Sequence, residues 1–265
     1  MGLNEAAGYG AVAVAAYAAA SVAARHNPRN SFWLTAVISV GGLALSLFAR
    51  DTRAHAAAES AQLTSTARPP AFWATFRRTT WGRRALSVTC AAGLVNQLND
   101  ALAWGLLPGY LASRGLSATT IGAVAAVYPA TWALSQPAFG ALSDTIGRAP
   151  LLGAGFLLQS AGIAVFAGPP TAAALIAGAA TLGLGTGMVY PTLIAVIGDH
   201  TTPAERAAAI GTYRLWRDLG YVVGAVVVGV SADAWGARPA IVTVAAITAI
   251  PAALAFWVRP AAAHP

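Results

Sequence analysis

The sequence predicts an all-α polytopic membrane protein with about eight transmembrane helices. Of its 265 residues, 57% are hydrophobic and only 9% are charged, whereas roughly a quarter of the residues in an ordinary soluble domain are charged. The apolar residues gather into runs close to the length of about 20 residues that an α-helix needs to cross a bilayer. A soluble core cannot absorb this excess, so an integral membrane protein is expected.

Eight apolar runs mark the expected spans. The first follows Glu5 with no basic residue before it. Because a secretory signal peptide begins with positive charge, we expect a retained span. The eight runs are Ala6–Ala24, Ser31–Ala49, Leu86–Leu111, Ile121–Leu142, Leu151–Ala167, Ala172–Gly198, Leu219–Ala234 and Ala240–Val258.

The arginines predict the orientation of the chain. All sixteen basic residues are arginine; twelve follow the second, fourth, sixth and eighth spans, and four lie on the other side. Because basic residues are enriched in cytoplasmic loops, we expect an integral protein of the cytoplasmic (inner) membrane with both termini in the cytoplasm. The net charge of +7 then follows from topology, and nucleic acid is not an expected partner.

Four regions follow from this pattern. Residues 1–49 carry two transmembrane helices, 50–84 a cytoplasmic Arg-rich linker, 85–259 a bundle of six helices, and 260–265 a short tail. In the linker, Phe72–Arg78 and Trp81–Arg84 predict a segment on the anionic inner leaflet, or a solvated linker held at the interface by aromatic rings. One cysteine and four scattered histidines predict no disulfide, metal site or cofactor.

A short polar island, Gly140–Arg148, separates the fourth and fifth spans. Gly147 permits the positive φ of a tight turn, and Pro150 suits the first position of the next helix. Asp144 can accept hydrogen bonds from free N–H groups near that helix start. Arg148 can pair with Asp144 or with the carbonyl end of the preceding helix. The island predicts an immediate return of the chain into the membrane.

Two internal echoes suggest repeats. Gly140, Asp144 and Gly147 recur 89 residues later as Gly229, Asp233 and Gly236. Three spans separate these copies, so they should lie on opposite faces of the membrane, as an inverted three-helix repeat requires. The pair Gly8-Tyr9 recurs 212 residues later as Gly220-Tyr221, six spans on, as a parallel repeat of two halves would.

The spacing Gly-x-x-x-Asp-x-x-Gly-Arg between two membrane helices resembles the signature loop of the major facilitator superfamily of secondary transporters. The resemblance implies that the last six spans form a carboxy-terminal half with inverted three-helix repeats. The first two spans then resemble the fifth and sixth of the usual twelve, as a remnant of an amino-terminal half after amino-terminal truncation. Thr145 and Ala149 stand where the family's loop usually carries basic residues, as in the weaker copy found in second halves.

The function implied by this resemblance is alternating access for a small solute, with energy from an ion gradient. Proton coupling and outward movement (efflux) are the form we expect, and enzyme activity is not expected. Gly140, Asp144, Gly147 and Arg148 would belong to a cytoplasmic gate. The alternative is that these residues only cap and turn the chain.

Polar residues inside the third span are candidates for the transport path. Asn96, Asn99 and Asp100 fall at i, i+3 and i+4, on one helix face, with Trp104 a turn later. A charged group in the membrane is costly and should face water or a partner. Asp100 could therefore bind solute or carry a proton. The alternative is an interhelical hydrogen-bond network with Asp100 protonated.

Further candidates lie in later spans. Tyr128 and Tyr190 each precede a proline, and Trp132 and Gln136 follow Tyr128 by one and two turns, so these side chains could line the same cavity; kinked packing is the alternative. Thr202-Pro-Ala-Glu205 predicts a capping box that starts a helix leading into the seventh span. Near its inner end, Asp218 could pair with Arg214 or Arg217, and Arg214 is the better helical neighbour, as an ion pair or for proton coupling.

Three other interpretations stay open. The chain could be a fragment of this family without independent transport, or could need a partner that supplies the missing helices. It could be a membrane scaffold. A membrane enzyme using Asp100, Asp144 or the histidines would need a cluster of catalytic groups, and none has workable spacing. The expected partners are a small-molecule solute, protons and the lipid bilayer.

Overall fold

The computed structural model describes residues 2–27, 29–48 and 71–255, which form helices joined by turns, with no strand among them. The expectations for residues 49–70 and for the tail lie outside these residues. The ends of the second and eighth expected spans, at Ala49 and Val258, lie outside them as well.

Helices stand at all eight places where spans were expected. The third is interrupted by a π-helical stretch, so that one rod consists of α5, η2 and α6. A short helix, α4, and a π-helical stretch, η1, precede it. The elements are α1 (Gly2–Arg25), α2 (Asn30–Ser46), α4 (Phe72–Arg77), η1 (Arg78–Gly82), α5 (Arg84–Ala101), η2 (Leu102–Leu106), α6 (Leu107–Ser113), α7 (Ala118–Ile146), α8 (Arg148–Phe166), α9 (Ala172–Asp199), α10 (Pro203–Trp235) and α11 (Ala237–Leu254).

Five of the described helices are long and apolar enough to cross a membrane, judged by length and composition: most of α1, and α8, α9, α10 and α11. A shorter apolar helix, α2, has 17 residues. The polar side chains of Asn96, Asn99 and Asp100 lower the hydropathy of α5, although ten of its residues are buried. The buried polar residues on α5 therefore mark the place where the bundle departs from a simple apolar core.

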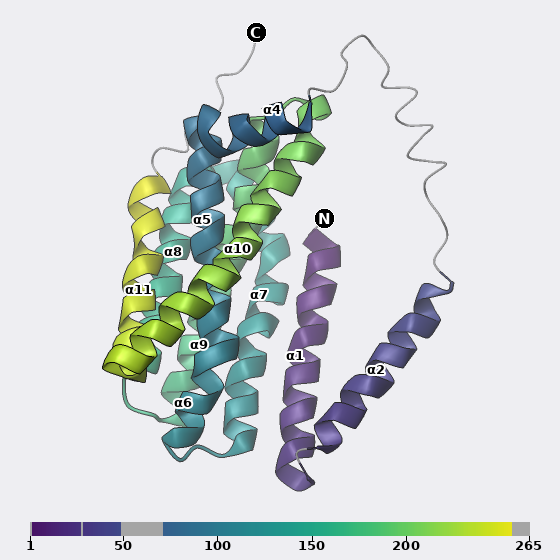
Figure 1. Ribbon diagram of the computed structural model, residues 1–265, viewed down its shortest axis with the longest axis vertical. Coiled ribbons are helices and arrows are strands. Elements are labelled where there is room, and N and C mark those ends of the chain that lie inside the picture. The colour runs from purple at the N-terminus through teal and green to yellow at the C-terminus, as the bar shows by residue number, and fades with distance from the viewer. Residues whose placement is uncertain (1, 28, 49–70, 256–265) are drawn as a thin grey trace.

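The helices α5 to α11 stand side by side as one bundle, and α1 and α2 lie at its edge (Figure 1). α9 packs against both α7 and α8, and α10 packs against α5. α1 packs along α7, whereas α2 contacts α1 and has no buried residue. α4 crosses the end of the bundle where α7 meets α8, called here the Arg148 end.

Glycines let α9 approach its neighbours closely. A Cβ atom on Gly183 would come within 2.4 Å of the carbonyl oxygen of Tyr128 on α7, and one on Gly185 within 2.6 Å of that of Gly155 on α8. No side chain fits these contacts. Small residues at such positions are typical of helix packing in membranes.

The two glycine turns predicted by the 89-residue echo have nearly the same backbone. Gly147 has φ 90° and ψ 162°, and Gly236 has φ 89° and ψ 167°. Each glycine ends one long helix and begins the next, and the two turns lie at opposite ends of the bundle (Figure 1). This arrangement is that of an inverted repeat.

Two local predictions at helix starts have different outcomes. The capping box of Thr202 and Glu205 is present, with Pro203 at the first position of α10, which runs unbroken for 33 residues. Pro150, however, is the third residue of α8 and not the first, because the helix begins directly after Gly147. The first turn of a helix still tolerates proline, since its N–H groups have no partner inside the helix.

We predict that Gly147→Ala destabilises the protein by about 1–3 kcal/mol, because its backbone lies in a region that is nearly restricted to glycine. Gly140→Ala is the matched control, since a Cβ there meets nothing within 4 Å and the residue is helical. Thermal unfolding of both variants in the same detergent measures the difference. Equal unfolding temperatures for the two variants would contradict the prediction.

Candidate functional site

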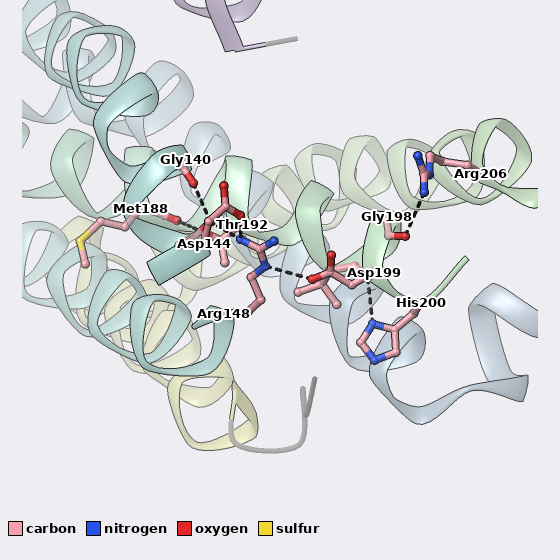
Figure 2. A network of polar contacts seen from close by, with 11 residues as sticks. Gly140, Asp144, Arg148, Met188, Thr192, Gly198, Asp199, His200 and Arg206 are labelled. Carbon is pink, nitrogen blue, oxygen red and sulfur yellow. Dashed lines mark hydrogen bonds and ion pairs between the residues drawn. The ribbon is translucent and has the colours of Figure 1, made fainter. Parts of the chain in front are cut away.

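Arg148 ties together three helices at the Arg148 end of the bundle (Figure 2). Its guanidinium donates to the carboxylate of Asp144 at 2.6 Å and to the hydroxyl of Ser143, both on α7. Its Nε donates to the carboxylate of Asp199 at the end of α9, at 3.0 Å. The predicted pairing with Asp144 is confirmed. The pairing with Asp199, 51 residues away, was not predicted.

The carboxyl end of α9 is surrounded by arginines. Arg148 binds the side chain of Asp199, Arg206 donates to the carbonyl of Gly198 at 3.3 Å, and Arg83 donates to the carbonyl of His200 (Figure 2 shows the first two). The last carbonyls of a helix have no partner within it and carry partial negative charge. Cations from three different segments therefore stabilise this helix end.

The segment α4–η1 lies against this end of the bundle. Thr75, Thr79 and Thr80 are buried, whereas Phe72, Trp73 and Trp81 are exposed. Arg78 forms an ion pair with Glu205, and Trp216 on α10 donates to the hydroxyl of Thr80 at 3.1 Å. The segment therefore presents a polar face to the protein and aromatic rings outward.

A hydrogen-bond network joins α5, α8 and α11 in the core. Gln159 on α8 donates to Asn96 at 3.0 Å and accepts from Asn99 at 2.6 Å. The hydroxyl of Thr248 on α11 donates to Asn99 at 2.6 Å. Asn96 and Asn99 thus take part in an interhelical hydrogen-bond network, which was the alternative to a place on the transport path.

Asp100 faces a different neighbour. The hydroxyl of Tyr128 on α7 donates to one carboxylate oxygen at 2.6 Å, and the amide of Gln97 donates to the other at 2.8 Å. Asn96 and Asn99 thus contact α8 and α11, whereas Asp100 contacts α7, because neighbouring residues of a tightly packed helix meet different helices. That the three residues line one transport path stays a prediction. The π-helical stretch η2 begins two residues after Asp100 and carries Trp104, whose ring lies 6.0 Å from that of Tyr128. Such stretches are frequent at functional sites.

Aromatic side chains continue from Asp100 toward α9. The ring centroid of Trp132 lies 5.8 Å from that of Tyr128 and 5.8 Å from that of Tyr190. Three of the four predicted aromatic residues, Tyr128, Trp132 and Tyr190, are buried, and Trp104 is partly buried. Gln136 is buried one turn beyond Trp132. The prolines after Tyr128 and Tyr190 lie inside unbroken helices.

Arg217 also contacts these aromatic residues, whereas the sequence named it only as a possible partner of Asp218. It donates to the hydroxyl of Tyr9 on α1 at 2.9 Å, and its guanidinium lies 4.7 Å above the ring of Tyr190. The ring of Tyr9 in turn stacks on Trp132, with centroids 3.4 Å apart. Tyr9, Trp132, Tyr190 and Arg217 are called here the Arg217 cluster.

Asp218 pairs with one of the two arginines that the sequence offered. Its ion pair is with Arg217, at 3.3 Å, the neighbour that helical spacing made the less favourable of the two. The side chain of Asp218 is 67% exposed, whereas that of Arg217 is 11% exposed. The sequence placed Arg217 outside the seventh span, but α10 begins at Pro203, so Arg217 lies about 21 Å along it.

Comparison with known proteins identifies the family. Residues 89–265 match the family model described as Major Facilitator Superfamily. The chain belongs to the major facilitator superfamily. The chain is 27% identical to the inner membrane transport protein YajR of Escherichia coli K12 over 184 residues, which cover 69% of this chain and 39% of that protein. It is 25% identical to the quinolone resistance protein NorA of Staphylococcus aureus Mu50 over 128 residues, covering 48% of this chain and 33% of NorA.

Solved structures share the fold. A peptide transporter POT in complex with sulfate superimposes with a TM-score of 0.60 at 22% identity, covering 67% of this chain and 38% of that one. The E310Q mutant with alafosfalin gives 0.61 at 22% identity, covering 73% and 42%. The chain thus spans less than half the length of these relatives. Membership of this family indicates an integral membrane protein and points to a transporter rather than an enzyme.

We predict that Gln159→Leu destabilises the protein by about 1–3 kcal/mol, because it leaves the buried amides of Asn96 and Asn99 without their partner. Thr181→Val is the control, since that exposed hydroxyl bonds only to the carbonyl of Ala177 on its own helix. Thermal unfolding in detergent measures both. A loss no larger than that of the control would show that the network contributes little to stability.

Proposed function

We propose that this protein is a secondary transporter that moves a small organic solute across the cytoplasmic membrane by alternating access. The observation that carries the proposal is the pair of polar sites in an otherwise apolar bundle. One is the buried group of Asp100 and the Arg217 cluster, midway along the helices; the other is the set of contacts around Arg148 at one end. Solute sites near the midplane and gates at the ends are the parts that alternating access needs.

Asp100 is the group that we assign to proton coupling. Ionisable side chains within membrane helices are rare and usually functional. When its carboxylate takes a proton, one oxygen becomes a donor and both become weaker acceptors, so the hydrogen bond with the hydroxyl of Tyr128 weakens or reverses its direction. Because Tyr128 is on α7 and Asp100 is on α5, protonation changes a contact between helices.

The contacts of Arg148 serve as the gate in this proposal. The side chain of Asp144 is 68% exposed and that of Asp199 is 40% exposed. Exposed ion pairs contribute only about 0–1 kcal/mol each, so these contacts can hold α7, α8 and α9 together in one state and break in the other. The excess of arginine on this side supports assigning it, with both termini, to the cytoplasm.

Outward movement of the solute is supported by the similarity to a quinolone resistance protein. The direction of transport is set by the gradient and by the order in which the proton and the solute bind. A quinolone, norfloxacin, is therefore the first solute to test. The assay is solute-dependent proton movement into vesicles that contain the protein and a pH-sensitive dye.

We predict that Asp100→Asn lowers the norfloxacin-dependent proton flux by about tenfold or more, because an amide cannot take up a proton at this position. The side chain keeps its size, and asparagine can still accept from Tyr128, so the helical content should be unchanged. Asp233→Asn, which removes an exposed carboxylate at the opposite end of the bundle, is the matched control. Normal flux in Asp100→Asn would exclude the proposed role.

We predict that Arg148→Gln and Asp144→Asn slow transport about fivefold, because losing about 1 kcal/mol in one of the two states shifts their populations by that factor. The binding constant for norfloxacin should change less than twofold, since the gate lies away from the Arg217 cluster. Asp233→Asn, the counterpart of Asp144 in the second repeat, serves again as control. A change in binding equal to the change in rate would contradict the gate assignment.

A further inference from the structure

Buried hydrogen-bond donors around the Arg217 cluster lack partners. Among the described residues, no partner is present for four buried atoms: Nε of Arg217, Nε1 of Trp132, Nε2 of Gln136 and the hydroxyl oxygen of Tyr213. The arginine, indole and amide nitrogens can only donate. Because buried polar groups in folded proteins are nearly always paired, several unpaired donors in one region indicate a missing acceptor.

These donors belong to one region of the bundle. Tyr190 contacts both Trp132 and Arg217, so α7 and α10 meet across it. Tyr213 lies four residues before Arg217 on α10, and Gln136 lies four residues after Trp132 on α7. Residues four apart share one face of a helix. Trp132 and Arg217 therefore meet across Tyr190, Gln136 follows Trp132 on the same face of α7, and Tyr213 precedes Arg217 on the same face of α10, where its ring packs against Gly93 of α5.

Tyr9 shows what kind of group this region accommodates. Its ring stacks on Trp132, and its hydroxyl oxygen accepts from Arg217 at 2.9 Å. The region is thus already occupied by an aromatic ring with an oxygen acceptor, the side chain of Tyr9 on α1. One phenol oxygen satisfies one donor, whereas a carboxylate offers two oxygens with about four acceptor sites and can bind a guanidinium with both.

The carboxylates nearby do not accept hydrogen bonds from these four unpaired donors. Both oxygens of Asp100 already accept hydrogen bonds, from Tyr128 and from Gln97. Asp218 is largely exposed and contacts one terminal nitrogen of Arg217. The unpaired acceptor in this part of the bundle, Oε1 of Gln97, belongs to the side chain that binds Asp100. Acceptors therefore gather on α5 and donors on α7 and α10.

We propose that the solute is an aromatic organic anion, in the simplest case a carboxylate, which replaces Tyr9 against Trp132 and binds Arg217. This inference rests on the proposed function and names the substrate class of the same site. Arg217 supplies the charge, Trp132 supplies a stacking surface and an N–H donor, and Gln136 and Tyr213 supply further donors.

The test is equilibrium binding of three probes that share one ring and differ in charge. Benzoate, benzamide and benzylamine are titrated calorimetrically into the purified 265-residue protein in detergent. We expect benzoate to bind at least tenfold more tightly than benzamide, because a charge-assisted bidentate contact is stronger than a neutral one. Benzylamine should bind more weakly still. Equal affinities, or a preference for the amine, would overturn the inference.

Two variants test whether Arg217 and Trp132 cause the preference for benzoate over benzamide. Arg217→Gln should reduce the ratio of the benzoate and benzamide affinities to about one, because the charge is lost. Trp132→Phe keeps a stacking ring but removes one donor, and should weaken benzoate binding about threefold to tenfold. Arg25→Gln, at the exposed end of α1, is the control and should keep the ratio of the unmodified protein. Should Arg217→Gln fail to fold, as judged by gel filtration and helical content, Trp132→Phe carries the test alone.

The result separates this inference from the proposed function. Selective benzoate binding without any solute-dependent proton flux would support the substrate class and contradict the transport proposal. Norfloxacin-dependent proton flux in a protein that shows no preference for benzoate would support transport and overturn the substrate class. An unchanged preference in Arg217→Gln would show that the anion binds elsewhere.

Discussion

The packing at the centre of this structure depends on one requirement: the guanidinium of Arg217, within the helical bundle, needs partners. Placing an arginine at the centre of a membrane helix costs about 2.5–3.5 kcal/mol on insertion scales, so Arg217 must find partners. It finds them on different helices: the hydroxyl of Tyr9 on α1, the ring of Tyr190 on α9, and Asp218 on its own helix. Through Tyr9 it also joins α1 to the bundle, across 208 residues of sequence.

Two kinds of buried polar group are distinguished by whether their hydrogen bonds are complete. Gln159, Asn96, Asn99 and Thr248 pair with one another between α5, α8 and α11, as a stabilising network should. Around Arg217, donors remain unpaired among the described residues. Complete networks stabilise helix packing, whereas incomplete ones leave room for a ligand. The contacts of Arg148 are a third kind, since they are exposed enough to exchange with water.

The sequence predicted much of the fold, because local rules determine it. Apolar runs located the helices, Gly147 and Gly236 located turns that need positive φ, and Thr202 with Glu205 located a helix start. The site was predicted less well. Helical spacing placed Asn99 beside Asp100, but spacing cannot say that one meets Gln159 and the other Tyr128. The contact between Tyr9 and Arg217 depends on how α1 packs, which no local pattern encodes.

The central claim is that the Arg217 cluster opens to each side of the membrane in turn. The most direct measurement is the labelling rate of Gln136→Cys, in a Cys90→Ser background, by a membrane-impermeant thiol reagent added to one side of oriented vesicles at a time. The background is suitable because Cys90 is buried. The account predicts labelling from both sides, with benzoate slowing it and a pH gradient changing the ratio of the two rates. Labelling from one side alone under every condition, or from neither side, would contradict the account.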